Sequence, residues 1–367
     1  MTSTLTTPEK DKPEKSKIAV LVVDDSAVVR GFYQRIINET ADITVIGTAG
    51  NGQQGVDFLQ KNTAAVDVVL MDVDMPVMDG LTALPKLLAL KPSVVIIISS
   101  GLSERSAELS IKTLALGAKD FIPKPQAKND LLSGQDFKDA LLSRIRALTI
   151  HKSGNPQRPV AAHSVRTRAH HNTSPIHALA IGASTGGPQA LLHILKETPN
   201  PKNIPLFITQ HMPPMFTTIL AKQISETTSW PCVEAVSGDI ARPGHAYLAP
   251  GDYHLTLSGT AAAPRMELNQ NPPENFCRPA VDPMVRSLAD IYGRGLLLLI
   301  LTGMGTDGAK GAEVVADKGG TIWAQDEATS VVWGMPGAAA ATGVCNQILP
   351  LPLIASTLHR HLQGGTR

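Results

Sequence analysis

Residues 18–37, IAVLVVDDSAVVRGFYQRII, place a short apolar run directly before an amphipathic stretch. The run at 18–23 is apolar throughout, which is typical of a strand covered on both faces of a parallel sheet. The same unit recurs up to residue 148, and this alternation predicts a βα series around a parallel sheet. The further strand-like runs are 43–46, 66–71, 94–98 and 121–122, and the further helical stretches are 53–60, 81–90, 107–116 and 137–148.

A second series of the same kind begins at residue 176. Its strand-like runs are 177–183, 204–209, 296–302 and 321–324, and a patch that resembles β-hairpins covers 246–257 and 265–268. Residues 151–175 contain four basic residues, four histidines and no acidic residue, which is typical of an exposed linker. We therefore expect the α/β class with two doubly wound parallel-sheet domains, at 17–149 and 176–367, joined by a linker at 150–175.

Composition limits the possible functions. The 367 residues carry 33 Lys and Arg against 32 Asp and Glu, a balance that argues against a nucleic-acid-binding protein. Apolar residues make up 43% and charged residues 18%, as in globular proteins. Three widely spaced cysteines support neither a disulfide framework nor a zinc module. The longest apolar run, 296–301, is shorter than the ~20 residues of a membrane span. These features predict a soluble cytoplasmic protein without membrane insertion.

Polar side chains follow several strands of the first predicted sheet. Asp24 and Asp25 follow the first strand, Asp72 the third, Ser99 the fourth and Lys124 the fifth. In open parallel sheets, ligands gather beyond the carboxyl ends of the strands. Clustered carboxylates repel one another unless a cation intervenes, which favours Mg²⁺ together with phosphate oxygens. A carboxylate held there can act as a nucleophile toward phosphorus. An acidic residue after a strand can also be a simple helix N-cap, which would suit Asp24 or Asp74 taken alone.

These residues resemble a response-regulator receiver domain over 17–149, through the Asp pair, DVDMPVMDG, the hydroxyl after strand four and the Lys-Pro step. The resemblance implies a flavodoxin-like fold, a histidine kinase as phosphodonor and Mg²⁺ as cofactor. The implied roles are Asp72 as phospho-acceptor, Asp24, Asp25, Asp72 and the carbonyl of Asp74 around the metal, Lys124 as phosphoryl contact, and Ser99 with Phe121 as the switch pair. Pro123, directly before Lys124, is a small departure that removes a backbone donor. A rival is the Asp-x-Asp motif of phosphohydrolases, which normally follows the first strand rather than the third.

The second series opens with 177–195, HALAIGASTGGPQALLHIL, which predicts a strand, a tight turn and a helix. Its G-x-S-x-G at 182–186 can present the Ser184 hydroxyl on a strained turn. Such a turn could equally cradle a phosphate, although the full G-x-G-x-x-G spacing is missing. His211 follows the next strand and is the candidate base.

The acid that would orient His211 could be Asp282, Asp307 or Asp326. Asp307 is favoured, because it follows the most apolar strand within a glycine-rich loop and so shares one sheet edge with Ser184 and His211. The same loops suggest the backbone amides of Thr185 or Met304 as oxyanion donors.

The motifs GASTGGP, QHMPP, YLAPGD, RPAVDPM, LTGMG.DGA and AQDE.TSVVWGMP resemble the methylesterase domain of chemotaxis response regulators along most of 176–350. The resemblance implies a Rossmann-like domain with a β-hairpin insertion and a triad of Ser184, His211 and Asp307. It also implies hydrolysis of glutamate methyl esters on chemoreceptors, deamidation of receptor glutamines, and a receiver domain that gates the site. The esterase site needs no metal or other cofactor.

Two other functional classes predict different sequence features. A response regulator whose second half binds DNA should show a basic recognition helix, whereas the segments after residue 176 show strands that end in Ser, His and Asp. A serine hydrolase for a small soluble ester remains open from the residues alone, because nothing in them spells out receptor recognition.

Overall fold

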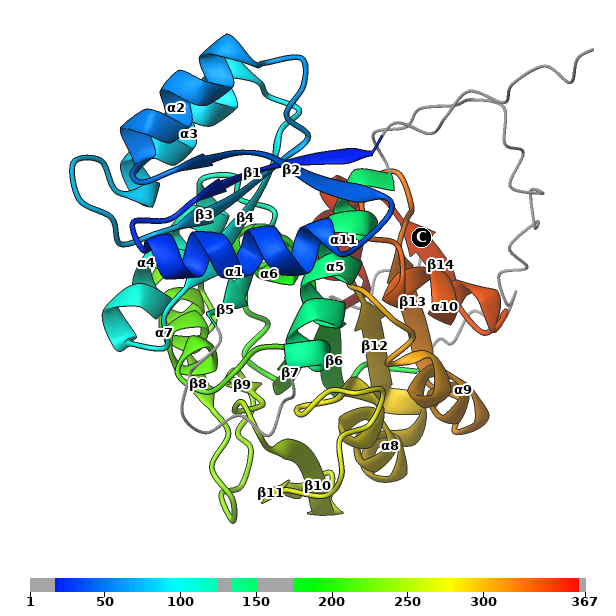
Figure 1. Ribbon diagram of the computed structural model, residues 1–367. Coiled ribbons are helices and arrows are strands. Elements are labelled where there is room, and N and C mark those ends of the chain that lie inside the picture. The colour runs from blue at the N-terminus through cyan, green and yellow to red at the C-terminus, as the bar shows by residue number, and fades with distance from the viewer. Residues whose placement is uncertain (1–16, 125–133, 151–173, 363–367) are drawn as a thin grey trace, which may run out of the picture.

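The computed structural model describes residues 17–124, 134–150 and 174–362, and in these ranges the chain forms two parallel sheets flanked by helices (Figure 1). The predicted α/β class is therefore confirmed. The first sheet has the order β2-β1-β3-β4-β5, and every pairing in it is parallel. The elements of this half are β1 (Ile18–Val23), α1 (Ala27–Asn38), β2 (Ile43–Ala49), α2 (Gly52–Lys61), β3 (Val68–Asp72), α3 (Gly80–Leu90), β4 (Val95–Ser100), α4 (Glu104–Ala115), β5 (Asp120–Pro123) and α5 (Gly134–Ile150).

The first sheet is covered on both faces, as its apolar strands predict. All five residues of β3 are buried, and alternate residues of β1 belong to different hydrophobic clusters. The helices begin where short polar side chains can accept the first backbone N–H groups. Ser26 caps α1, so the N-cap reading of Asp24 is wrong: its Oδ1 accepts the Ser26 N–H at 2.9 Å instead. The Asp24 side chain therefore stays in the turn beyond β1.

The second half is built around a seven-stranded sheet of order β14-β13-β12-β6-β7-β9-β8, with every pairing parallel, and a separate antiparallel hairpin of β10 and β11. Strand β6 lies between β7 and β12, so the chain winds outward from β6 in both directions. The carboxyl ends of β6 and β12 form the topological switch point at which ligands gather in such sheets. The elements are β6 (Ala178–Ala183), α6 (Gly187–Glu197), β7 (Leu206–Gln210), α7 (Phe216–Thr227), β8 (Cys232–Glu234), β9 (Ala246–Leu248), β10 (His254–Thr260), β11 (Ala263–Asn269), α8 (Val281–Tyr292), η1 (Gly293–Gly295), β12 (Leu296–Ile300), α9 (Ala309–Asp317), β13 (Thr321–Gln325), α10 (Met335–Ala341), β14 (Gln347–Leu349) and α11 (Leu351–Leu362).

The structure corrects one local prediction in this half. The patch at 246–257 was expected to form hairpins, but its first part is β9, a parallel strand of the main sheet that pairs with β7 and β8. Only β10 and β11 form a hairpin. Helix α5 extends to Ile150, and residues 151–173 of the expected linker lie outside the described residues. None of the helices in the described ranges combines the length and apolar character needed to cross a membrane.

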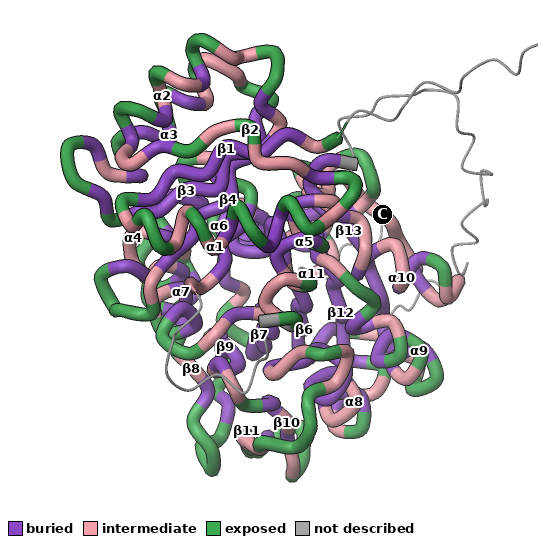
Figure 2. Tube along the Cα trace, viewed as in Figure 1, coloured by how far each residue is buried: buried purple, intermediate pink, exposed green. Residues whose placement is uncertain are grey.

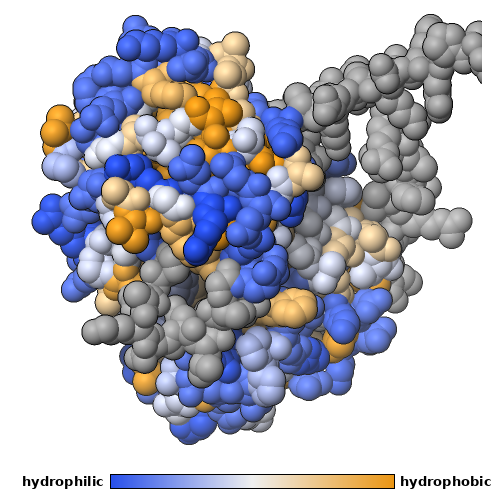
Figure 3. Space-filling model, in the orientation of Figure 1, coloured by the Kyte–Doolittle hydropathy of each residue, from blue (hydrophilic) through white to orange (hydrophobic). Residues whose placement is uncertain are grey.

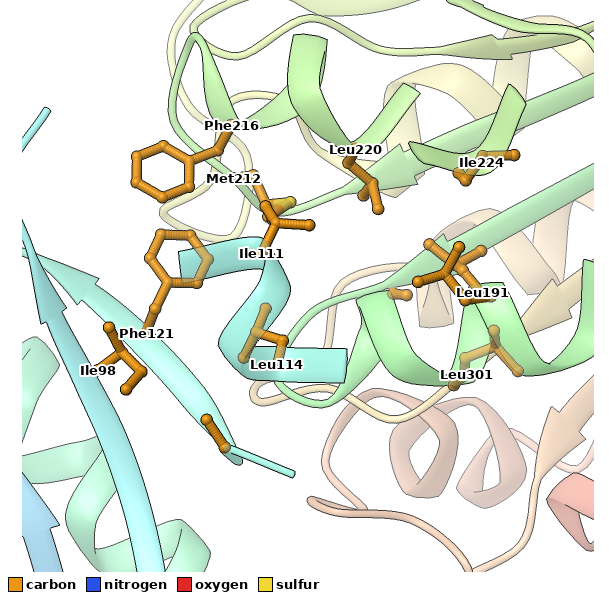
Figure 4. Packing of buried hydrophobic residues seen from close by; sticks show 14 of the residues in the cluster. Ile98, Ile111, Leu114, Phe121, Leu191, Met212, Phe216, Leu220, Ile224 and Leu301 are labelled. Atoms are coloured by element: carbon orange, nitrogen blue, oxygen red, sulfur yellow. The ribbon is translucent and has the colours of Figure 1, made fainter. Parts of the chain in front are cut away.

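The two halves share one hydrophobic cluster, so the receiver-like half packs directly on the second half. Phe121 of β5 stacks on Phe216 of α7 with ring centroids 4.4 Å apart, and Ile111 and Leu114 of α4 belong to the same cluster (Figure 4). Val332 of the second half also packs in a hydrophobic cluster with residues of α5 from the first half. Buried backbone runs through both halves in Figure 2, while the face seen in Figure 3 is predominantly hydrophilic.

Candidate active site

Ser184 lies directly after β6, on the turn that leads into α6. Gly186 caps this helix with a φ of +76°, a left-handed conformation that favours glycine. A Cβ on Gly187 would come 2.0 Å from the Gln210 side chain, so the turn requires glycine there as well. The Ser184 N–H donates to the Thr302 carbonyl at 3.1 Å, which ties the nucleophile turn to the loop after β12. The half-buried serine side chain is thereby held at the switch point.

His211 lies directly after β7 and uses both ring nitrogens. Its Nε2 is 2.7 Å from Asp307 Oδ2, and its Nδ1 is 3.3 Å from the Cys277 sulfur. Within the described residues no hydrogen bond joins the Ser184 hydroxyl to His211. Because Asp307 engages Nε2, Nδ1 is the ring nitrogen that is left to receive a proton from Ser184.

Asp307 is a buried carboxylate, 1% exposed, that is held at the N-terminus of α8. Its Oδ2 accepts the Val281 N–H at 2.6 Å, and its Oδ1 accepts the Asp282 N–H at 3.1 Å. The Asn275 side-chain amide donates to Oδ1 at 2.9 Å. Helix N-termini and backbone amides stabilise carboxylates in this way. Asp307 therefore has the partners that a buried negative charge needs, and His211 is one of them.

The other two candidate acids do not contact His211. Asp282 accepts the N–H groups of Gly308 and Gly311 at 3.0 and 2.7 Å, and so stabilises the start of α9. Asp326 accepts the Thr329 N–H at 3.1 Å in the following loop. Of the three carboxylates left open by the sequence, the structure brings only Asp307 to His211.

The surroundings of Asp307 and His211 favour a charged carboxylate paired with a charged imidazole. Burial alone would raise the pKa of Asp307, but the hydrogen bond and charge of His211, together with the α8 amides, hold that pKa below its usual value. Burial would lower the pKa of His211, yet the hydrogen bonds to Asp307 and Cys277 outweigh it and raise the pKa to about 10. This arrangement favours the protonated form of His211 at neutral pH, so the imidazole must lose a proton before it can accept one from Ser184.

A cavity of about 390 Å³ lies at the contact between the two halves and is lined by two of the three candidate residues, Ser184 and His211. The second half contributes Ser184, Thr185 and His211 to its wall, and the first half contributes Phe121 and Arg144. Thr185 lines the cavity, whereas Met304, the other suggested oxyanion donor, is not part of its lining. The Thr185 hydroxyl donates to Asp120 of the first half at 2.9 Å. The first half therefore covers the site and contacts the residue beside the nucleophile.

The acidic residues of the first sheet also converge. Asp24, Asp25 and Asp72 each offer a carboxylate oxygen within 4.8 Å of the others. Lys124 Nζ lies 2.7 Å from both Asp24 Oδ2 and Asp72 Oδ2. The Asp74 side chain is outside this group, 3.7 Å from Arg105, so Asp74 would reach a metal there through its backbone carbonyl. Three hard oxygen donors at this spacing fit Mg²⁺.

Ser99 and Phe121 lie on the two strands beyond Asp72. Ser99 is the register partner of Asp72, and its hydroxyl is hydrogen-bonded to Tyr33 at 2.7 Å. Phe121 points out of the first half and stacks on Phe216. Pro123, which lacks a backbone donor, does not disrupt the pairing of β4 with β5. The Lys124 N–H donates to the Ser100 carbonyl at 2.7 Å directly after it.

Comparison with known proteins matches both halves of the chain. The family model described as CheB methylesterase covers residues 179–358, and that of the response regulator receiver domain covers 20–134. A protein-glutamate methylesterase/protein-glutamine glutaminase 1 of Paramagnetospirillum magneticum is 47% identical over 95% of this chain and 97% of its own length. The chain belongs to the CheB methylesterase family. A relative from Azospirillum brasilense is 44% identical over 94% of this chain and 92% of its own length.

Solved structures of the family resemble the two halves separately. The Thermotoga maritima CheB methylesterase catalytic domain matches 51% of this chain and 99% of its own length at 38% identity, with a TM-score of 0.49. The response regulator domain of Thermotoga maritima CheB matches 35% of this chain and 94% of its own length at 36% identity, with a TM-score of 0.32.

In this CheB family member, the sequence motifs did not indicate the contacts of four site residues. Asn275 donates to both Asp282 and Asp307, and Cys277 contacts His211. Gln210 donates to the Ser184 carbonyl at 2.9 Å, and Gln325 accepts the Thr302 N–H at 2.9 Å. All four lie within or beside the quoted motifs, but only the three-dimensional contacts reveal what each side chain does.

The raised pKa of His211 predicts an unusual pH dependence. Deprotonation is needed before Ser184 can give up its proton, so hydrolysis of a small activated ester by the unphosphorylated protein should rise from pH 7 toward pH 10. Initial rates across this range test the expectation, with the Ser184→Ala variant measured in parallel to subtract hydrolysis by hydroxide. A corrected rate that is flat or falls over this range would contradict the proposed environment of His211.

Proposed function

We propose that this protein hydrolyses glutamate methyl esters on the cytoplasmic domains of chemoreceptors and deamidates receptor glutamines, under the control of phosphorylation at Asp72. The observation that carries the proposal is the hydrogen bond between Asp307 and His211, a residue that lines the same cavity as Ser184. Relatives of the same architecture, similar over nearly their whole length, carry the name protein-glutamate methylesterase/protein-glutamine glutaminase.

The chemistry is acyl transfer to Ser184. The hydroxyl oxygen attacks the γ-carbonyl carbon of the ester while His211 Nδ1 takes its proton. The imidazolium is stabilised by Asp307 and gives the proton to the methoxy oxygen, or to the amide nitrogen of a glutamine, as the bond from that atom to the carbonyl carbon breaks and methanol or ammonia leaves. Water then attacks the acyl-serine and releases the carboxylate. The Thr185 amide, beside the nucleophile on the cavity wall, suits the developing oxyanion better than the Met304 amide, which lies away from that lining.

The receiver half acts as a gate over this chemistry. Its Phe121 and Arg144 wall the cavity, and the Gln189 side chain of α6 donates to the Ala118 carbonyl at 2.7 Å across the contact. A receptor segment reaches Ser184 only when this contact opens. Phosphorylation places charge at Asp72, next to Ser99, and Phe121 lies between that site and Phe216. We infer that phosphorylation shifts the population toward the open arrangement.

The phosphorylation site would use Mg²⁺, held by Asp24, Asp25, Asp72 and the carbonyl of Asp74. When bound, the ion neutralises the phosphate oxygens during phosphoryl transfer. The Asp72 carboxylate accepts the phosphoryl group from a cognate histidine kinase. Lys124, already 2.7 Å from Asp72, is placed to pair with an oxygen of the new acyl phosphate.

Removal of the serine nucleophile tests the esterase assignment. Ser184→Ala should reduce methanol release from receptor membranes that carry labelled methyl esters by at least about a thousandfold, because the acyl intermediate cannot form. Phosphate uptake by the same variant should be unchanged, which provides a folding control. Methanol release at the parent rate by Ser184→Ala would refute the serine mechanism.

Removal of the phospho-acceptor tests the gate. Asp72→Asn should keep the basal rate of methanol release but lose its stimulation by acetyl phosphate and Mg²⁺, because an amide cannot form the acyl phosphate. Asp57→Asn, on the distant helix α2, serves as the matched control and should respond like the parent. If Asp72→Asn were stimulated as strongly as the parent, the receiver would not be the switch.

Weakening the interdomain contact should mimic activation. Gln189→Ala removes one hydrogen bond between the halves, worth about 1 kcal/mol, so basal methanol release should rise by roughly fivefold. Gln53→Ala, on the exposed surface of α2, is the control and should leave the basal rate unchanged. A basal rate in Gln189→Ala at or below that of the parent would argue against occlusion of the site by this contact.

A further inference from the structure

Among the described residues that line the cavity, Cys277 offers a thiol that the proposed esterase chemistry does not use. Its sulfur lies 3.3 Å from His211 Nδ1, on the side of the ring opposite the nitrogen that contacts Asp307. It also lines the cavity that contains Ser184. Cys277, His211 and Asp307 therefore form a continuous hydrogen-bonded chain of the kind that activates sulfur nucleophiles.

The surroundings of the three cysteines differ sharply. Cys232 and Cys345 are buried, and burial raises the pKa of each thiol to about 12. Cys277 is only partly buried, and its sulfur contacts a ring nitrogen of His211. Small solutes that enter the cavity can therefore reach Cys277, whereas the other two thiols serve as internal controls.

The segment that carries Cys277 fixes the sulfur close to the surface. Asn275 and Phe276 have φ values of +52° and +62°, and backbone hydrogen bonds in both directions join Glu274 and Cys277. The Phe276 side chain is fully exposed. This short closed turn holds the thiol against His211 while leaving one side of it open to the cavity.

We propose that Cys277 is an oxidation site, at which hydrogen peroxide or another small hydroperoxide converts the thiol to a sulfenic acid and thereby switches off hydrolysis at Ser184. The modification itself depends only on the contact between Cys277 and His211. Its effect on activity rests on the proposed esterase function.

The oxidation step balances with the groups at the site. When His211 is neutral, the thiol proton moves to its Nδ1, and the thiolate attacks one peroxide oxygen. The O–O bond breaks, and the departing hydroxide takes the proton back from the imidazolium to become water. The products are Cys277 sulfenic acid, neutral His211 and one water molecule: the sulfur has lost two electrons and the peroxide has gained them.

The product would block the hydrolase directly. The sulfenic hydroxyl faces His211 Nδ1, the nitrogen that must accept the Ser184 proton, and its oxygen takes up space in the cavity between the two side chains. A sulfenic acid is reduced by thiols, so the block is reversible.

The test treats the full-length protein with hydrogen peroxide in the presence of dimedone, which traps sulfenic acids, and locates the adduct by mass spectrometry. We expect the adduct on Cys277 and none on Cys232 or Cys345. In parallel, without dimedone, hydrolysis of a small activated ester should fall at least fivefold after peroxide and recover with dithiothreitol. Each protein is compared with its own untreated sample, so any direct effect of a substitution on activity cancels.

Two variants separate the proposal from general oxidative damage. Cys277→Ala should keep its untreated rate after peroxide, whereas Cys345→Ala should lose activity as the parent does. Equal loss in Cys277→Ala and the parent, or dimedone on a buried cysteine in place of Cys277, would overturn the proposal. If the untreated parent did not hydrolyse esters, the esterase function would fail, and the dimedone site alone would still decide whether Cys277 is the oxidation site.

Discussion

The arrangement of the site follows from the free-energy cost of burying the charged Asp307 carboxylate. A charge that is almost completely removed from water must be surrounded by donors, and Asp307 receives them from the first amides of α8, from Asn275 and from His211. These donors come from three separate segments, so the folding of the loop after β12 fixes α8 and the imidazole together. The orientation of His211 follows from this: Asp307 holds Nε2, and Nδ1 faces the cavity.

A second feature of the structure is the contact that links the two sheets. Each sheet places its polar residues beyond the carboxyl ends of its strands, and the first half is packed so that β5 and α4 lie over the switch point of the second. Phe121 lies on β5, two strands from Asp72 in the first sheet, and stacks on Phe216 at the start of the helix after His211. The strand that carries Phe121 therefore joins the sheet of Asp72 to the wall of the cavity.

Sequence patterns were sufficient where local chemistry determines the structure. Apolar runs identified the long buried strands, and the residues that follow them included Ser184, His211 and Asp307, because carboxyl ends of parallel strands meet at one edge. Short strands such as β9 were misread, since three residues carry too little periodicity to distinguish a sheet strand from a hairpin. Asn275 and Cys277 were missed because their roles depend on contacts with residues far away in the sequence.

Hydrogen–deuterium exchange on the full-length protein, with and without acetyl phosphate and Mg²⁺, tests the central claim that phosphorylation uncovers a site closed by the receiver half. The account predicts that, once the phosphorylated mass is observed, amides in the peptides that contain Phe121 and Phe216 exchange faster, while those in β12 do not change. Unaltered exchange at both peptides in fully phosphorylated protein would contradict it.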